Sequence, residues 1–116
     1  PSGGFLSTSS DMILWEKALR DRKIILKKES WDMLWQPFIK TSDKPESKQY
    51  YGFGWFVDEY NGHKVIQHGG ANTGFSSHYD RFVNDGISII VLTNTDEANP
   101  AKITRALADY YFRSKR

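Results

Sequence analysis

The chain has 116 residues, with 16 Lys and Arg against 14 Asp and Glu, for a formal net charge of +2. This length suits one small domain, so we expect residues 1–116 to form a single domain or a fragment of one. The charges are spread evenly along the sequence, which argues against a nucleic-acid partner. The absence of cysteine excludes disulfides, zinc–thiolate sites and cysteine nucleophiles. No apolar run approaches the ~20 residues of a membrane span.

Two helices are expected in the first third of the chain. Thr8 is a potential N-cap, and apolar residues recur at helical spacing over 9–20. The face of this helix expected to pack on the core comprises Met12, Trp15, Ala18 and Leu19. A shorter helix is expected over 28–35, ended by Pro37. Residues 40–49 contain no large apolar side chain and are expected to form an exposed loop.

The middle of the chain has the alternating pattern of antiparallel strands. A first strand is expected over 51–58, followed by a hairpin turn at Asn61-Gly62 and a return strand over 63–69. A second hairpin is expected from strands 75–82 and 87–93. Because the last of these strands is nearly all apolar, we expect it to lie centrally in the sheet, with both faces covered.

A final helix is predicted after Asn99, which is a good N-cap and is followed by Pro100 at the first helical position. Its buried face is expected to consist of Ile103, Leu107, Tyr110 and Tyr111. The predicted order is two helices, four strands and one helix. The fold class is therefore α+β, an antiparallel sheet of about four strands with flanking helices.

The segment best suited to chemistry runs from Gln67 to Phe75 and contains three glycines within six residues. Glycines on a strand allow a ligand or another backbone to approach closely, where exposed N–H groups could donate to a carbonyl oxygen. His68 adds a group that exchanges protons near neutral pH. The alternative is an ordinary glycine-rich turn beside a structural histidine, and this pattern alone favours that alternative.

Other candidate sites are weaker. Of the three histidines, His63 and His68 should face opposite sides of one strand, so only His68 and His78 could converge. Two imidazoles without a nearby carboxylate make a poor metal site, and we expect none. Ser76 and Ser77 do not lie in a Gly-x-Ser-x-Gly elbow and should be strand residues. Four tryptophans could form a carbohydrate platform, but their periodic positions favour core packing: Trp15, Trp31, Trp35 and Trp55.

Five short motifs follow one another along the chain between Gly3 and the final helix. Together they resemble the C-terminal part of the serine β-lactamase family, which is related to class C β-lactamases, D-alanyl-D-alanine carboxypeptidases and esterases. Each motif is short, and the ordered set carries the resemblance: Gly3-Gly4-Phe5-Leu6-Ser7-Thr8-Ser9-Ser10-Asp11-Met12, Tyr51-Gly52-Phe53-Gly54-Trp55, His68-Gly69-Gly70, Thr73-Gly74-Phe75-Ser76-Ser77 and Val91-Leu92-Thr93-Asn94.

The resemblance implies roles for individual residues. His68-Gly69-Gly70 matches the His-x-Gly form of the family's third active-site motif. His68 would then supply polarity or positive charge beside the nucleophile, while Gly69 and Gly70 let the substrate lie against the strand. The N–H of Ala71 would be an oxyanion-hole donor, a contribution worth ~10²–10³ in rate elsewhere. Thr73 and Gly74 would shape the floor of the cleft. Because many relatives have Lys where His68 stands, its charge would depend on pH.

Two of the family's motifs are missing. No serine is followed by Lys three residues later, as in Ser-x-x-Lys, and Tyr-x-Asn does not occur. Because the chain begins at Pro1, we interpret it as a piece of a longer protein with the nucleophile outside it. The resemblance then implies acyl-enzyme hydrolysis of a small-molecule or peptide amide, lactam or ester, without a cofactor. The isolated chain would be inactive.

Two other interpretations of the sequence stay open. The chain could be a non-catalytic binding or structural module that keeps the sheet without the chemistry. Its exposed strand edges could also pair with a second copy. Family members are often exported, so an extracytoplasmic location is expected by analogy alone.

Overall fold

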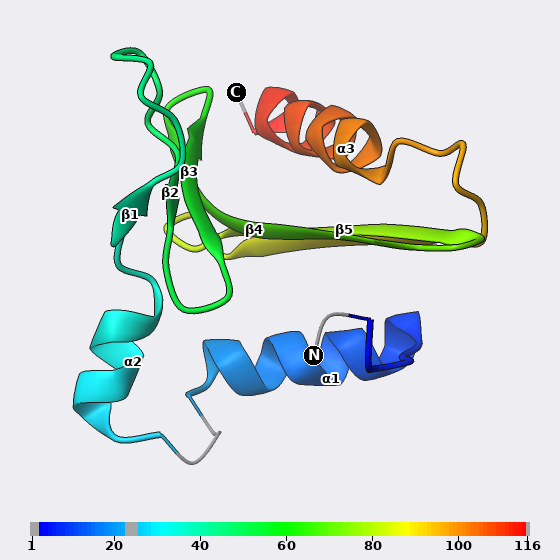
Figure 1. Ribbon diagram of the computed structural model, residues 1–116, viewed down its shortest axis with the longest axis horizontal. Helices are drawn as coiled ribbons and strands as arrows, with labels where there is room; N and C mark the ends of the chain where they lie inside the picture. Colours follow the sequence, from blue (N-terminus) through cyan, green and yellow to red (C-terminus); the bar gives the residue numbers. More distant parts are fainter. Residues whose placement is uncertain (1–2, 23–25, 116) are drawn as a thin grey trace.

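The computed structural model describes residues 3–22 and 26–115. It contains a six-stranded antiparallel sheet in the order β1-β2-β3-β4-β5-β6. Helix α1 covers one face of the sheet and α3 covers the other (Figure 1). The elements are α1 Ser9–Arg20, α2 Lys28–Leu34, β1 Ile39–Lys40, β2 Tyr50–Tyr51, β3 Phe56–Tyr60, β4 His63–Asn72, β5 Phe75–Phe82, β6 Ile87–Thr93 and α3 Pro100–Ser114.

The α+β class is confirmed, but the sheet has more strands than the sequence pattern predicted. The single strand expected over 51–58 was wrong, because residues 52–55 form a turn that separates β2 from β3. Gly52 donates its N–H to the Trp55 carbonyl at 2.8 Å, and Gly54 has a φ of +74°. Such a φ is accessible to glycine and strained for most other residues. The chain therefore folds back, and β2 pairs with β3.

Both predicted hairpins are confirmed. Asn61 and Gly62 have φ values of 50° and 83°, as a tight turn between β3 and β4 requires. The bounds of β5 and β6 are those predicted, and Ser76 and Ser77 lie within β5. Strand β4 is longer than expected, because it continues beyond Gly69 to Asn72.

Strand β6 lies at the end of the described sheet and not at its centre. Among the residues that the structure describes, its one strand partner is β5. Both α1 and α3 contact β6, so a helix lies on each face, but coverage is partial, because the residues of β6 are half-buried and Leu92 is 44% exposed. An apolar strand needs covered faces, which helices can provide, and this does not require neighbouring strands on both sides.

The buried face of α3 differs from the predicted one. Asn99 caps the helix by accepting from the Lys102 N–H at 2.9 Å, and Pro100 follows as expected. The buried residues, however, are Pro100, Thr104 and Ala108, whereas Ile103, Leu107 and Tyr110 are exposed. Small side chains allow α3 to lie close to the sheet. Ala108 packs there with Val65 and Phe82, which form the core on this side.

Helix α1 also packs through a face that its sequence did not predict. Thr8 caps it by accepting from the Asp11 N–H at 3.2 Å. Leu19 is buried as expected, but Trp15 is 45% exposed, and Glu16 is buried in its place. Trp31 is buried, and Trp35 and Trp55 meet edge to face with ring centroids 5.6 Å apart. Core packing is therefore found for Trp31, whereas Trp35 and Trp55 are half-buried and the prediction was wrong for Trp15.

Glu16 is buried because β5 supplies charged and polar partners for it. The Arg81 Nε donates to Glu16 Oε2 at 2.6 Å, and Arg81 Nη2 donates to Oε1 at 3.3 Å. The Tyr79 hydroxyl donates to Oε2, and Arg20 lies 3.3 Å from Oε1. Burial raises the pKa of Glu16, but its bonds with Arg81 and Tyr79 outweigh burial, and the net pKa is lowered. Burial and the Glu16 carboxylate raise the pKa of Tyr79.

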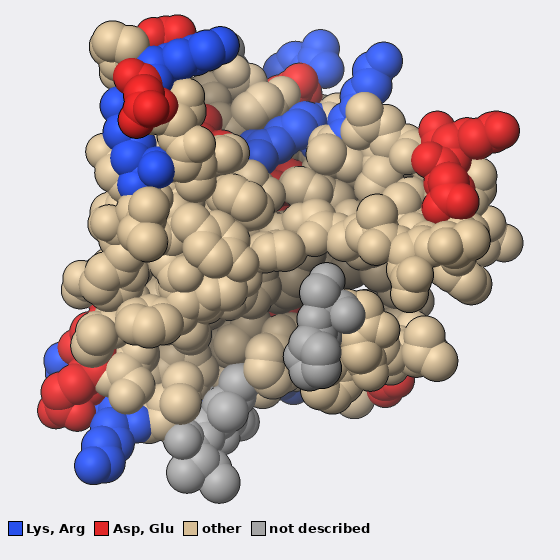
Figure 2. All heavy atoms as spheres, viewed as in Figure 1, with Lys and Arg blue, Asp and Glu red and all other residues tan. Residues whose placement is uncertain are grey.

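Charged side chains are dispersed over the surface seen in Figure 2. Lys and Arg alternate with Asp and Glu near its periphery, while the middle of this face is made of other residues (Figure 2). The arrangement follows from the balanced composition of 16 basic and 14 acidic residues.

We predict that Glu16→Gln destabilises the fold by about 3 kcal/mol at pH 7, because it leaves the buried Arg81 guanidinium without a counter-charge. Glu16 has a lower pKa in the folded than in the unfolded protein. Its stabilisation is therefore present above the unfolded pKa and is lost as the pH falls through the folded value. In urea unfolding, the free energy of unfolding should fall more between pH 7 and pH 3 for the wild type than for the variant.

Glu29→Gln is the matched control, since Glu29 is an exposed glutamate on α2. It should change the free energy of unfolding by less than about 0.5 kcal/mol. Equal effects of the two substitutions would contradict a role for Glu16 as the buried partner of Arg81.

Candidate functional site

The segment from His68 to Asn72 lies on β4 with one side open. Strand β3 pairs with β4 only as far as the Phe56–Gln67 pair, after which β5 is the one described partner of β4. All five residues of this segment are exposed. The first half of β4 is thus interior to the sheet, and the second half is an edge.

The strand register decides which backbone groups face this open side. The β4–β5 hairpin closes through the two-residue turn Thr73-Gly74, so Asn72 and Phe75 form a hydrogen-bonded pair. Hydrogen-bonded and non-bonded pairs alternate along an antiparallel ladder. The N–H and C=O groups of Gly69 and Ala71 therefore point away from β5, toward the open side. The β3–β4 hairpin, which closes on Tyr60 and His63, requires the same alternation.

The two glycines of the motif lie close against β5. A Cβ on Gly70 would lie 2.8 Å from Ser77 Oγ, and one on Gly69 would lie 3.2 Å from His78 Nδ1. A side chain at either position would have to displace its neighbour on β5. Because neither glycine has a side chain, no Cβ projects from either face of this part of β4, and a ligand can lie along the strand.

His68 is held by bonds to both ring nitrogens. Its Nδ1 lies 2.5 Å from the Gly69 carbonyl oxygen, and its Nε2 lies 3.2 Å from the Tyr51 hydroxyl. Because a carbonyl can only accept, Nδ1 carries a proton, and in neutral His68 Nε2 accepts from Tyr51. Sequence reasoning did not assign Tyr51 to the site. Tyr51 is the first residue of the motif at positions 51–55. Its side chain reaches His68 on β4 only because β2 pairs with β3.

The Thr73-Gly74 turn is tied to the loop before α3. The Gly74 N–H donates to both carboxylate oxygens of Asp96 at 2.9 Å, and the Thr73 N–H donates to Asn72 Oδ1 at 2.9 Å. Acidic side chains lie at this end of the molecule, where Figure 1 places the β4–β5 turn (Figure 2). Asp96 was not predicted from the sequence, since its partner is distant along the chain.

His68 and His78, the one pair of histidines whose spacing allowed convergence, do not converge. His68 pairs with Tyr79 and His78 with Gly69 across the β4–β5 ladder. Cross-strand partners share a face and successive residues alternate, which places the two imidazoles on opposite faces of the sheet. His78 is buried beside Asp80, with Nε2 3.2 Å from Oδ1. Within residues 3–22 and 26–115, no three His, Cys, Asp or Glu side chains form a group that could hold a metal ion.

The arrangement of these elements agrees with comparisons to known proteins. The family model described as Beta-lactamase matches residues 1–111. The chain belongs to the β-lactamase family. Among solved structures, this β-lactamase-family chain is similar to the octameric penicillin-binding protein homologue from Pyrococcus abyssi, with a TM-score of 0.79 and 23% sequence identity. The match covers 90% of this chain and 24% of that one, so the chain spans about a quarter of that protein's length.

None of the curated proteins matches the chain. In the part of the chain that the structure describes, no helix is both long and apolar enough to cross a membrane.

We predict that Gly52→Ala destabilises the β-lactamase-family fold by about 2 kcal/mol and disturbs His68. A Cβ at Gly52 would lie 2.8 Å from the backbone carbonyl oxygen of Gln36, and backbone cannot move aside cheaply. The turn that begins at Gly52 places Tyr51 against His68. Chemical denaturation should report the loss of stability, and the NMR shifts of the His68 ring should report the displacement of Tyr51.

Gly54→Asn is the control in the same turn. No atom of the described residues lies within 4 Å of a Cβ there, and Asn tolerates the positive φ better than most residues. It should cost less than about 1 kcal/mol and leave the His68 ring shifts unchanged. A harmless Gly52→Ala would contradict the close approach of this turn to Gln36.

Proposed function

We propose that the chain is part of a serine hydrolase that acts through an acyl-enzyme on an amide, lactam or ester. The observation that carries the proposal is the open section of β4, where the register directs the Ala71 N–H outward, three residues after His68. A substrate carbonyl oxygen lying along this edge could accept from that N–H. Membership of the β-lactamase family supports the same chemistry.

The proposed mechanism divides between this chain and a nucleophile supplied outside it. A serine oxygen adds to the substrate carbonyl, and the negative charge that develops on the carbonyl oxygen is stabilised by the Ala71 N–H. When this intermediate collapses, the C–N or C–O bond breaks and the proton lost by the serine hydroxyl passes to the leaving nitrogen or oxygen, which in a lactam stays attached to the opened ring. Water then hydrolyses the acyl-serine to the carboxylic acid and free serine. Gly69 and Gly70 leave room for the substrate, and Thr73 and Gly74 shape the floor of the cleft.

His68 would act in this scheme through its charge and hydrogen bonding. Its Nε2 meets the Tyr51 hydroxyl, so in the neutral ring this lone pair is already engaged. Protonation would place a positive charge on the strand beside the reacting carbonyl without loss of the Gly69 contact. We therefore propose an electrostatic role for His68 and not that of a general base.

The alternative function is a binding or structural module without hydrolytic activity. The observation that favours it is the absence of Ser-x-x-Lys and Tyr-x-Asn from these 116 residues. Reading the sequence upstream of Pro1 separates the two proposals. A Ser-x-x-Lys and a Tyr-x-Asn in frame support the hydrolase, whereas a start codon close to Pro1 supports the module.

We predict that neither a fluorescent penicillin nor a fluorophosphonate labels the isolated chain. In a longer form with Ser-x-x-Lys upstream, that serine should be labelled, and Ala71→Pro should slow acylation ~10²–10³-fold because proline has no N–H to donate. Gel fluorescence of labelling time courses and peptide mass spectrometry would measure the rate and the labelled residue.

Ala71→Ser is the matched control, since it retains the N–H and should label within a few-fold of the wild type. Labelling of any serine in the isolated chain would contradict a nucleophile outside it. Wild-type acylation by a folded Ala71→Pro variant would contradict the oxyanion role of Ala71.

We also propose that, in preparations of this chain alone, the outer side of β6 pairs with a strand of a second copy. Strand β6 is an apolar edge with backbone groups available for pairing, which favours edge-to-edge association. The Pyrococcus abyssi relative is described as octameric. Sedimentation velocity should show association that increases with concentration. Ile90→Pro should reduce it, because the register directs the Ile90 N–H to the outer side of β6, where proline would block pairing. A monomer at all concentrations would contradict this proposal.

A further inference from the structure

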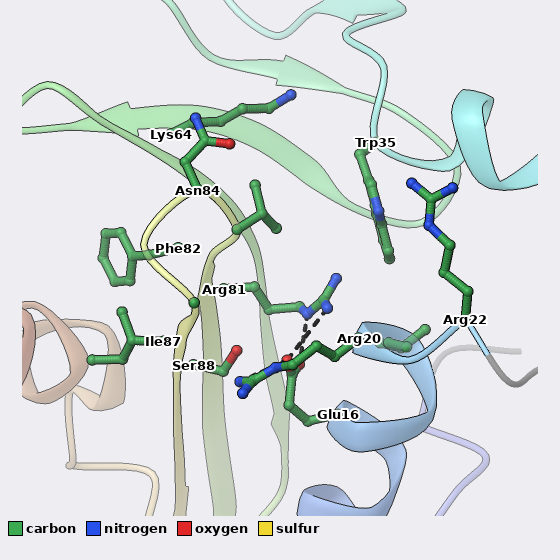
Figure 3. A pocket seen from close by; sticks show the side chains of 13 residues that line it. Glu16, Arg20, Arg22, Trp35, Lys64, Arg81, Phe82, Asn84, Ile87 and Ser88 are labelled. Carbon is green, nitrogen blue, oxygen red and sulfur yellow. Dashed lines mark hydrogen bonds and ion pairs between the residues drawn. The ribbon is translucent and has the colours of Figure 1, made fainter.

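A hollow of about 350 Å³ lies between the C-terminal half of α1, the end of α2 and the turn from β5 to β6. Figure 3 shows its side chains converging from these elements. Four cationic side chains and a single carboxylate line it, together with an indole: Arg20, Arg22, Lys64, Arg81, Glu16 and Trp35. The pocket therefore has a net positive lining and one aromatic wall, and it shares no residue with the segment from His68 to Gly74.

Arg81 is the most constrained of these cations. Its side chain is 5% exposed, and its Nε and Nη2 both donate to Glu16. Its Nη1 is buried and has no hydrogen-bond acceptor among the described residues. In Figure 3 the guanidinium lies between Glu16 and Trp35, with one end on the carboxylate and the other directed away from it. A buried charged donor without an acceptor is costly, so this position favours a ligand that can accept.

Among the described residues, the carboxylates closest to the other cations of the pocket are each shared with a further cation. Glu16 already accepts from Arg81, Tyr79 and Arg20. Arg22 lies 3.6 Å from Asp32, but Lys28 shares that carboxylate at a closer 2.5 Å. Glu59, which is opposite Lys64 on the neighbouring strand, is bound by Lys48 at 2.8 Å.

We propose that this pocket binds a small oxyanion, a phosphate or the phosphoryl group of a small molecule. The phosphate oxygens would accept from Arg81 Nη1, while Arg22 and Lys64 would neutralise the second charge. A phosphate has more acceptors than a carboxylate and carries about 1.5 to 2 negative charges at neutral pH, which matches a pocket with several donors. The Trp35 ring, 4.7 Å from the Arg81 Cζ, holds the guanidinium in place from the other side.

The test is titration of the 116-residue chain with inorganic phosphate and with glycerol 3-phosphate at constant ionic strength, using sodium chloride as the reference. Isothermal titration calorimetry should show saturable binding of one anion per chain, and the NMR signal of the Arg81 Nε–H should shift along the same curve. Tighter binding of inorganic phosphate would identify the free ion as the ligand, and tighter binding of glycerol 3-phosphate would identify a phosphorylated small molecule.

Lys64→Gln should weaken phosphate binding about tenfold, the loss of one charged contact worth about 1.4 kcal/mol. Lys102→Gln removes the same charge from an exposed position on α3 and should leave the affinity unchanged. Both substitutions change exposed side chains, so the fold is retained in each. Equal weakening by both variants, or no phosphate effect beyond that of chloride, would overturn the proposal and leave water as the partner of Arg81 Nη1.

Discussion

The placement of α1 depends on the buried contact of Glu16 with Arg81 and Tyr79. A buried ion pair contributes little net free energy compared with apolar packing, because both charges must leave water. It does restrict orientation strongly, since any other rotation of α1 would leave Glu16, Arg81 or both buried without a partner. The helix is therefore held on one face of the sheet in one rotational setting, with Trp15 directed outward.

The same contact organises the features on that face. Tyr79 pairs with His68 across β4 and β5, so the residue that binds Glu16 lies directly beside the candidate site. Arg81 uses one edge of its guanidinium for Glu16, which leaves Nη1 without an acceptor among the described residues. One carboxylate on α1 thus supports both the strand that carries the family motif and the cation proposed to bind an oxyanion.

The open half of β4 arises from where β3 begins. Residues 52–55 turn the chain, and the ladder between β3 and β4 reaches only to Phe56 and Gln67. A strand running without interruption from Tyr51, as the alternating pattern suggested, would have continued beside His68 and covered the edge. The glycine-rich turn instead ends the pairing and also brings the Tyr51 hydroxyl to the His68 ring. The same few residues therefore expose the backbone of β4 and orient its histidine.

Local signals in the sequence determined the helix caps at Thr8 and Asn99, the turn at Asn61-Gly62, the bounds of β5 and β6, and the family resemblance later shown by the match over residues 1–111. Caps and tight turns depend on a few adjacent residues, so short patterns are sufficient to predict them. Tertiary structure alone decided that Glu16 is buried and Trp15 exposed, that α3 packs through Thr104 and Ala108, and that β6 is an edge. It also brought Tyr51 to His68 and Asp96 to Gly74. These outcomes depend on partners far along the chain, and hydrophobic periodicity carries no information about which polar side chain will meet a buried partner.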